Sequence, residues 1–247
     1  MTRGSRNVPA KARLTPEEVA LFDGINPASL RRLLLAALES FAEHGFRGTT
    51  TRDIARHAKM SNAAIYSHYQ SKDELLFEIS LAIHTVMLDD MRESFTRSST
   101  ARERLANVVR TLVTHHAHQQ TAARVATYEL RSLSPAHRAS IAAIRRDMES
   151  IIREAIRAGA DEGEFTVPDL GVATMAIVSL VVDVARWYNP ARRLTPDELA
   201  EHYVVLVEGL VRARPARARG RAPERAEIPE RIGVVSRPRA RKAAAAG

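Results

Sequence analysis

Apolar side chains recur at helical spacing along most of this sequence, and no stretch shows the sustained alternation of apolar and polar positions that a β-strand has. Between Leu30 and Phe41 the apolar residues stand three and four positions apart, and Gly45 follows where glycine commonly ends a helix. The pattern predicts about nine helices, near residues 30–44, 50–58, 61–67, 71–95, 101–119, 122–133, 135–159, 168–188 and 195–210. We therefore expect an all-α fold.

Residues that can cap a helix precede several of these segments and support their boundaries. In a capping box, a Ser or Thr and an acidic residue three positions later each accept a hydrogen bond from the other's backbone. Pairs with this spacing include Thr50 with Asp53, Ser71 with Glu74, and Thr195 with Glu198. Pro135 and Pro168 stand where proline is favoured, at the start of a helix.

Residues 50–69 combine a capped helix, a three-residue break at 59–61 and a second short helix. This is the helix-turn-helix arrangement, in which the first helix braces the second so that its N-terminal residues face base edges in the major groove. Ile65 is the only aliphatic residue large enough to anchor the second helix, so we expect its other side chains to face outward. They suit DNA, because an amide pairs with adenine, a methyl group meets thymine, and a phenol or imidazole reaches phosphate. A helical pair without a nucleic-acid role is the alternative.

The distribution of charge agrees with DNA binding. The net charge is +4 over residues 30–72, +4 over residues 1–14 and +8 over residues 212–247, whereas the rest of the chain carries −8. A basic region followed by an acidic body is expected when only one part of a protein meets a polyanion. We expect a basic N-terminal arm at 1–28, which either enters a minor groove or is a plain disordered terminus, and a solvated, disordered basic tail at 214–247.

Four strings resemble the DNA-binding domain of TetR-family transcriptional repressors. They are Leu-Leu-Ala-Ala-Leu-Glu-Ser-Phe-Ala-Glu-His-Gly-Phe at 34–46, Thr-Thr-Thr-Arg-Asp-Ile-Ala at 49–55, Ala-Ala-Ile-Tyr-Ser-His-Tyr at 63–69, and Ser-Lys-Asp-Glu-Leu-Leu at 71–76. The resemblance implies a three-helix reading domain, which we place at residues 29–76. It also implies an all-helical body at residues 77–213 that binds a ligand and dimerises.

Carried over by position, the resemblance implies DNA contacts from both helices of the motif and a phosphate contact from the lysine that opens the next helix. The candidate DNA-binding residues are Thr50, Thr51, Arg52, Asn62, Ala63, Ala64, Tyr66, Ser67, His68, Tyr69 and Lys72. One turn position departs from the family pattern, because Lys59 stands where the family usually has glycine. A positive φ at Lys59 costs on the order of 1 kcal/mol, which the fold can tolerate.

The segment from Pro168 to Tyr188 is apolar on nearly every side, so both of its faces need cover. Together with the apolar stripe of 195–210, a second copy of the chain would supply that cover through a four-helix interface about a two-fold axis. Such a homodimer places two reading helices about 34 Å apart, one turn of DNA, and fits a palindromic operator. The alternative is that both helices form the internal core of a monomer.

The sequence also suggests where an effector binds. Arg124 and Tyr128 share a helix face, and Trp187 beside Arg186 can stack on a flat group such as adenine. The strings at 128–135, 163–165 and 183–188 resemble the branch of the family that senses acyl-CoA esters of fatty-acid or steroid breakdown. The candidate effector-binding residues are Arg124, Tyr128, Arg131, Asp183, Arg186 and Trp187. Surface ion pairs for the arginines, and a packing role for the tryptophan, are the alternative.

Other function classes find little support. The chain has no cysteine, which excludes disulfides and Cys-ligated metals, and the histidines at 115, 116 and 118 lack the carboxylate cluster that a metal site needs. No catalytic or nucleotide-binding motif is present, so we expect neither an enzyme nor a cofactor. The longest uncharged apolar run, 170–182, is too short to span a bilayer, and with no signal peptide at the N-terminus we expect a cytoplasmic protein without membrane association.

We thus expect a sequence-specific transcriptional repressor that a small-molecule effector releases from its operator, with an acyl-CoA as the candidate effector. A ligand-independent regulator or an activator is the alternative within DNA binding. A helical interaction module, or an enzyme with incidental basic helices, is the alternative from another class.

Overall fold

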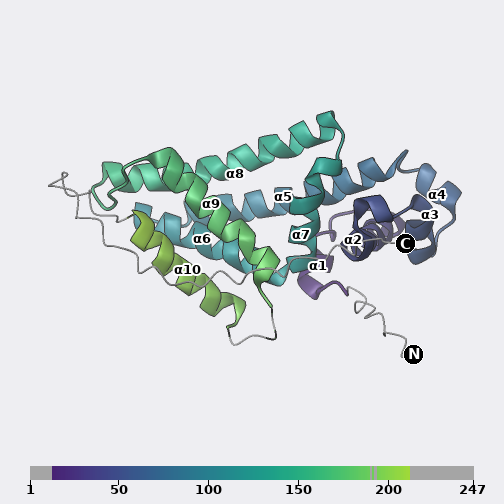
Figure 1. The fold of residues 1–247 in the computed structure, drawn as a ribbon, viewed down its shortest axis with the longest axis horizontal. Coiled ribbons are helices and arrows are strands. Elements are labelled where there is room, and N and C mark those ends of the chain that lie inside the picture. The colour runs from purple at the N-terminus through teal and green to yellow at the C-terminus, as the bar shows by residue number, and fades with distance from the viewer. Residues whose placement is uncertain (1–12, 190, 192–193, 212–247) are drawn as a thin grey trace, which may run out of the picture. The chain divides into compact units, whose positions relative to one another are not determined.

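The computed structural model describes residues 13–189, 191 and 194–211, and in this part of the chain every regular element is a helix and no strand forms (Figure 1). Its elements are α1 (Pro16–Ala20), α2 (Ala28–Gly48), α3 (Thr51–His57), α4 (Asn62–Tyr66), α5 (Lys72–Thr96), α6 (Ala101–His118), α7 (Gln120–Tyr128), a 3₁₀ turn (Glu129–Ser132), α8 (Pro135–Asp161), α9 (Leu170–Trp187) and α10 (Pro196–Val211). The all-α expectation is confirmed. The nine predicted helices correspond to α2–α10, and α1 is an addition.

The predicted caps form, with two differences. Thr50 and Thr195 close complete capping boxes with Asp53 and Glu198. Ser71 Oγ accepts from Glu74 N at 3.2 Å, but the Glu74 carboxylate accepts from Gln70 N, one residue before the expected partner. Helix α9 begins at Leu170, two residues after the predicted Pro168, because Asp169 Oδ1 accepts from Val172 N at 2.8 Å and caps the helix there.

Part of the segment assigned to the basic arm is packed structure. Glu18 in α1 is fully buried, and its carboxylate accepts from Ala122 N and Thr15 N, each at 2.9 Å. The backbone N–H groups in the first turn of a helix have no partner within the helix, so Glu18 supplies one at the start of α7. Leu21 and Phe22, which follow α1, are also buried. Residues 1–12 of the predicted arm, and the tail predicted at 214–247, lie outside the described residues.

Two apolar cores organise the described residues, and α5 contributes to both. The first lies among α2, α3, α4 and the first half of α5, and it also takes in Val125 and Ala126 of α7. The second lies among α6, α8, α9 and α10, with Met87 and Met91 from the second half of α5. A single uninterrupted helix therefore connects the expected reading domain to the body, across the predicted boundary at residue 76.

Helix α9 is the one described helix that is long and apolar enough to cross a membrane by length and composition. It packs against α6, α7, α8 and α10, as a core helix does. It also carries Asp183 and Arg186 near its end. The packing accounts for much of its apolar character, because Ile177, Val181 and Val184 are at most 1% exposed.

Candidate DNA-reading face and effector cavity

Helices α3 and α4 form the braced pair that the sequence predicts. Ile54 and Ala55 of α3 and Ile65 of α4 are buried, at most 3% exposed, and hold the two helices on the first core. Lys59 in the turn has a φ of 55°, as expected from its position, and is the only non-glycine residue with positive φ in the described part of the chain. Arg32 Nε donates to the carbonyl of Ala58 at 3.1 Å and fixes the turn to α2.

Most of the candidate DNA-binding side chains lie on the open side of this pair. Thr50, Arg52, Asn62, Ala63, Tyr66, Ser67 and His68 are exposed, and Thr51 and Ala64 are half-buried. The Tyr66 hydroxyl lies 3.1 Å from Thr51 Oγ, so a hydrogen bond joins the outer faces of the two helices. The structure therefore presents one continuous polar surface. That these residues contact DNA stays a prediction.

Tyr69 corrects the expectation that Ile65 alone anchors this segment. Its side chain is 9% exposed and belongs to the first core. Burial raises the pKa of its hydroxyl to about 12, with a smaller contribution from Glu78 and Glu74. Tyr69 is therefore first of all a packing residue, unlike the exposed Tyr66 three positions earlier.

Lys72 holds two helices together at the start of α5. Its Nζ donates to the carbonyls of Phe46 at 2.6 Å and Thr49 at 2.9 Å, and it lies 4.3 Å from the centre of the Phe46 ring. These carbonyls lie at the end of α2, where backbone acceptors lack partners within the helix. The ammonium group keeps one proton beyond these two bonds, so a phosphate contact from Lys72 stays a prediction.

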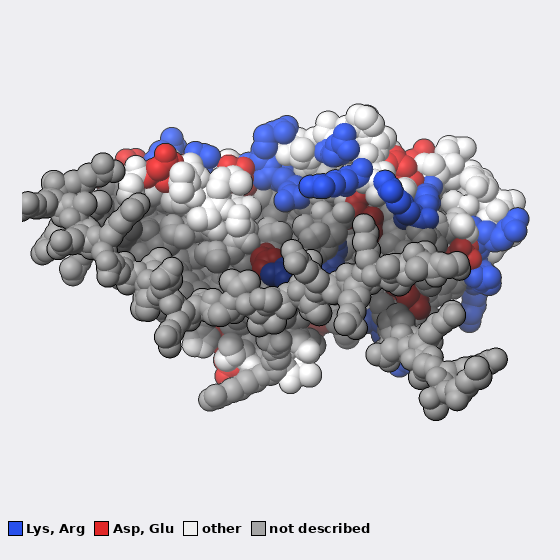
Figure 2. All heavy atoms as spheres, viewed as in Figure 1, with Lys and Arg blue, Asp and Glu red and all other residues white. Residues whose placement is uncertain are grey.

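A cavity of about 400 Å³ opens within the body, between α5, α6, α8 and α9 and next to the 3₁₀ turn. Its walls are mostly apolar and include Met87, Met91, Leu112, Met148, Ile152, Val178, Val181 and Val182. Four arginines also line it, Arg131 from the 3₁₀ turn and Arg138, Arg145 and Arg146 from α8. Figure 2 shows Lys and Arg side chains gathered over α8. An apolar interior with arginines in its lining suits a molecule that is apolar at one end and anionic at the other.

The six candidate effector residues do not share one site. Arg131 lines the cavity. Asp183 and Arg186 form an exposed ion pair through two hydrogen bonds of 2.6 and 2.7 Å. Trp187 is half-buried, packs against the second core and meets the Tyr188 ring edge-on, with the ring centres 6.4 Å apart. For these last three residues the structure favours the alternative of a surface ion pair and a packing tryptophan.

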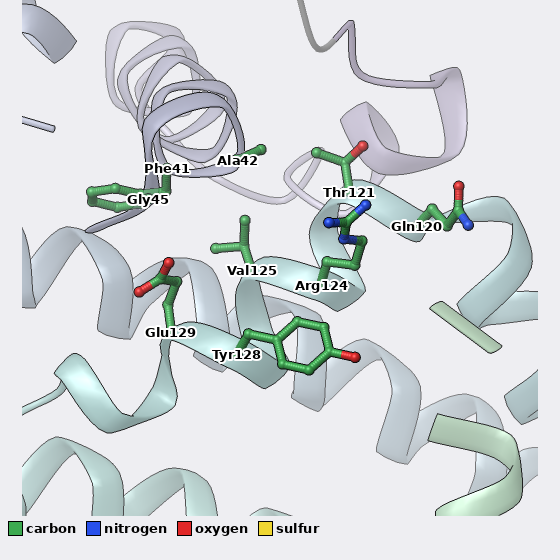
Figure 3. Close-up of a pocket in the computed structure, with 9 residues that line it drawn as sticks. All are labelled: Phe41, Ala42, Gly45, Gln120, Thr121, Arg124, Val125, Tyr128 and Glu129. Atoms are coloured by element: carbon green, nitrogen blue, oxygen red, sulfur yellow. The ribbon is translucent and has the colours of Figure 1, made fainter. Parts of the chain in front are cut away.

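Arg124 and Tyr128 line a different and smaller pocket, of about 250 Å³, between α2 and α7 (Figure 3). Gly45 and Glu129 lie across this pocket, and Glu129 Oε1 stands 3.4 Å from the point that a β-carbon at position 45 would occupy. The pocket is more polar than the cavity and sits at the junction of reading domain and body. It is therefore a separate feature from the larger, mostly apolar cavity.

Sequence reasoning missed most of the polar residues of the cavity. Arg138 and Arg145 are seven residues apart and so share one face of α8, which is a signal that the sequence contains. His84 and His116 carry no such signal, because they lie on different helices and each stands as a single histidine on an apolar face. His116, predicted to be a solvated or core histidine, is buried. No group of three or more side chains able to hold a metal forms among the described residues.

Helices α9 and α10 leave a set of large apolar side chains uncovered. Val172 and Met175 of α9 are 67% and 52% exposed, and Val205 and Leu206 of α10 are 68% and 58% exposed. Isolated apolar residues are common on protein surfaces, but several on neighbouring helices mark an interaction surface. We call these four residues the α9–α10 face.

A braced helix pair with an exposed polar face, joined by one helix to a body that encloses an apolar cavity, is the architecture of a one-component DNA-binding regulator. The family models agree. Residues 33–79 match the model described as bacterial regulatory proteins of the tetR family, and residues 98–211 match the tetracyclin repressor-like C-terminal domain. The chain belongs to the TetR family of bacterial transcriptional regulators.

Individual relatives cover most of this chain. The crystal structure of a tetR-family regulatory protein from Rhodococcus RHA1 is 40% identical, with a TM-score of 0.72 over 75% of this chain and 98% of that one. The HTH-type transcriptional repressor KstR2 of Mycobacterium tuberculosis is 28% identical over 72% of this chain and 90% of its own length. The fatty acid metabolism regulator protein of Bacillus subtilis is 26% identical over 54% of this chain and 69% of its own length.

Proposed function

We propose that this protein is a transcriptional repressor that binds a palindromic operator as a homodimer and leaves it when an acyl-CoA occupies the cavity. The observation that carries the proposal is the cavity itself, apolar inside, lined by four arginines and bordered by the helix that begins in the reading domain. Two relatives support it by name, one a transcriptional repressor and the other a regulator of fatty acid metabolism. A protein that acts on chromosomal DNA in this way works in the cytoplasm.

The reading face supports sequence-specific binding. Asn62 and Ala63 stand exposed at the start of α4, where an amide can pair with adenine and a methyl group can meet thymine. Tyr66, His68 and Arg52 surround them and can reach phosphates. The braces behind this face are fully buried, so the side chains are held in place before DNA arrives.

The α9–α10 face supports the homodimer. A second copy related by a two-fold axis would bury the same apolar residues from both chains at once. The same symmetry would present two α4 helices to successive turns of the major groove.

The lining of the cavity supports an acyl-CoA over a small neutral metabolite. Met, Leu, Ile and Val side chains can enclose an acyl chain or ring system, and burial of apolar surface supplies most of the binding free energy. Arg131, Arg138 and Arg146 are exposed residues of the lining, and guanidinium groups bind phosphate oxygens in pairs. Of the six candidate effector residues, Arg131 is the one that lies in this cavity.

Contacts next to the cavity join the start of α8 to the first turns of α5, so that a change at the cavity can reach the reading domain. Asp73, in the first turn of α5, accepts from Ser134 N at 2.7 Å and from His137 Nδ1 at 2.5 Å. The His137 ring stacks on Phe77 of α5, with ring centres 4.1 Å apart and planes 7° apart. Arg138 follows His137 directly. Release requires that the effector bind the conformation unsuited to DNA more tightly by several kcal/mol.

A DNA-release assay tests the proposal. Operator fragments selected from the protein's own genome are bound, and acyl-CoA esters, the matching free acids and free CoA are added. We expect the esters to release DNA and the Arg138→Ala, Arg146→Ala double variant to need at least tenfold more ester, about 1.4 kcal/mol. Arg157→Ala is the matched control, because Arg157 lies on α8 but pairs with Glu154 outside the cavity.

Two outcomes separate the parts of the proposal. If no CoA ester releases DNA from folded, operator-bound protein, the acyl-CoA assignment fails and the repressor assignment stands. If the protein shows no sequence preference in a DNA titration, or no steep loss of affinity with salt, the repressor assignment itself fails.

A further inference from the structure

Two buried histidines belong to the cavity lining, in addition to its arginines, Thr127 and Glu149. His84 of α5 is 7% exposed and His116 of α6 is 4% exposed, and both line the cavity. The two imidazoles thus reach the same cavity from two different helices. Neither residue serves the DNA-reading face.

The hydrogen bonds of the two rings identify which nitrogen carries the proton. His84 Nδ1 lies 2.8 Å from the carbonyl oxygen of Ser80, and His116 Nδ1 lies 2.7 Å from that of Leu112. A carbonyl oxygen only accepts, so Nδ1 must be the donor in both rings. In a neutral imidazole the other nitrogen, Nε2, then holds an unshared electron pair.

Burial keeps both rings neutral. It lowers the pKa of each imidazole to about 4, and the positive charge of Arg145 adds to the effect in both cases. At neutral pH the two Nε2 atoms are therefore hydrogen-bond acceptors. A wall with two such acceptors favours a ligand group that donates.

Both acceptors are open to a ligand. Neither Nε2 has a hydrogen-bond partner within the described part of the chain. Two side-chain atoms of the described residues are both buried and without a hydrogen-bond partner, Arg31 Nε and Ser80 Oγ. The Nε2 atoms of His84 and His116 are not among these buried atoms, so they are accessible from the cavity. A ligand that fills the cavity without a donor would cover these nitrogens and leave them unpaired, which is costly, so a ligand that supplies a donor gains binding free energy there.

We propose that the part of the effector enclosed by the cavity carries a hydroxyl group, which donates to Nε2 of His84 or His116. This inference rests on the proposed function only in taking the cavity as the effector site. A hydroxyl oxygen can also accept, and Arg145 lines the same cavity without a hydrogen bond or ion pair to any described residue. A ketone or carboxylate oxygen in the same place can accept from Arg145, but it has no proton to donate to either Nε2.

Matched ligand pairs test the inference without a change to the protein. We would measure dissociation constants by isothermal titration calorimetry at neutral pH for ω-hydroxyacyl-CoA esters and their unsubstituted parents, from octanoyl to tetradecanoyl. The same pairs as free acids form a second series without CoA. A flexible chain lets the hydroxyl reach the imidazoles at one favourable length. At that length we expect about three- to tenfold tighter binding of the hydroxylated member.

Three substitutions assign the preference to the imidazoles. The His84→Phe, His116→Phe double variant keeps an aromatic ring at both positions and removes both acceptors, so it should bind the two members of each pair alike. His118→Phe is the matched control, because it replaces an exposed histidine of α6 that does not line the cavity. It should keep the hydroxyl preference.

The inference is overturned if hydroxylated and parent ligands bind equally at every length, if ω-oxo chains bind as tightly as ω-hydroxy chains, or if no member of either series binds. A hydroxyl preference among free acids, with no binding of CoA esters, would support it while the acyl-CoA proposal fails. If CoA esters release DNA but bind equally well with and without a hydroxyl group, the acyl-CoA proposal stands and the hydroxyl inference fails.

Discussion

A side chain that is a candidate for DNA binding can also stabilise the fold, and Lys72 illustrates this. Its ammonium group donates to the carbonyls of Phe46 and Thr49, so its substitution tests folding as well as DNA binding. Lys59, which is exposed in the turn, makes a useful comparison because it carries the same charge without these bonds.

Lys72→Ala should lower the free energy of unfolding by about 1–2 kcal/mol, because two carbonyls lose a charged donor. It should also weaken operator binding and reduce its salt dependence by about one counterion if the remaining proton meets a phosphate. Urea denaturation and a salt titration of DNA affinity measure the two effects. Stability equal to that of Lys59→Ala would contradict the structural part of this prediction.

Tyr66→Ala should weaken operator binding about tenfold, since the phenol is 44% exposed and positioned by Thr51. Its thermal unfolding should hardly change. Tyr128→Ala is the matched control, because Tyr128 is 51% exposed and lies in the body. Equal operator affinity for both variants would contradict the assignment of the reading face.

His84 and His116 give the stability of the protein a defined pH dependence. Burial lowers their pKa to about 4 from an ordinary value of 6.5, so the unfolded chain binds protons in this interval that the folded chain does not. Their contribution to stability is complete above about pH 6.5 and is lost as the pH falls toward 4. Between pH 7 and pH 5 we expect a loss of about 2 kcal/mol per histidine in urea denaturation. The His84→Phe, His116→Phe variant should show a shallower dependence, and an unchanged one would mean that other groups cause it.

Among the elements, α1 shows how five residues can matter to the whole domain. Glu18→Ala should lower the free energy of unfolding by about 1–3 kcal/mol, because Ala122 N at the start of α7 is left buried without an acceptor. Glu17→Ala, next to it but exposed, should have little effect. Chemical denaturation compares the two, and equal stabilities would show that the α7 cap contributes little.

The sequence predicts the long helices well and the short or composite features poorly. The break at Gly45, whose φ of 69° interrupts α2, and the capping box at Thr50 follow from local chemistry, whereas the positive φ at Lys59 follows from the resemblance to the family; the structure confirms each. The sequence does not predict helix α1, because a helix of five residues is too short to show a helical period of apolar positions. Its stability comes from contacts with α7, far along the chain.

The reading face could be predicted and the cavity could not, for a physical reason. The reading residues lie within one short stretch, so their spacing alone places them together. The cavity gathers His84, His116, Arg145 and Val181 from four helices, and only their packing brings these residues to one wall. Trp187 is predicted to stack on a ligand because Arg186 stands next to it in the sequence, yet its side chain packs against the second core.

At the scale of the whole molecule, the α9–α10 face should hold two chains together. Leu206→Asp places a carboxylate where the partner's apolar side chains are expected, and an unpaired charge there costs several kcal/mol. Sedimentation velocity at micromolar concentration should give a dimer for the wild type and a monomer for this variant. Ala143→Asp, exposed on α8, should remain dimeric. A wild-type monomer would refute the interface.

The unbroken course of α5 allows a small event in the cavity to have a large mechanical effect. Met87, which lines the cavity, lies 15 residues from Lys72, or about 22 Å at 1.5 Å per residue, so a tilt of about 5° at the cavity would move the start of α5 by about 2 Å. In a two-fold dimer both copies of α5 move, and the distance between the reading helices would change by up to about 4 Å against a DNA repeat of about 34 Å. The stiffness of α5, rather than a large rearrangement of the body, would then determine how strongly the affinity for the operator responds to an event in the cavity.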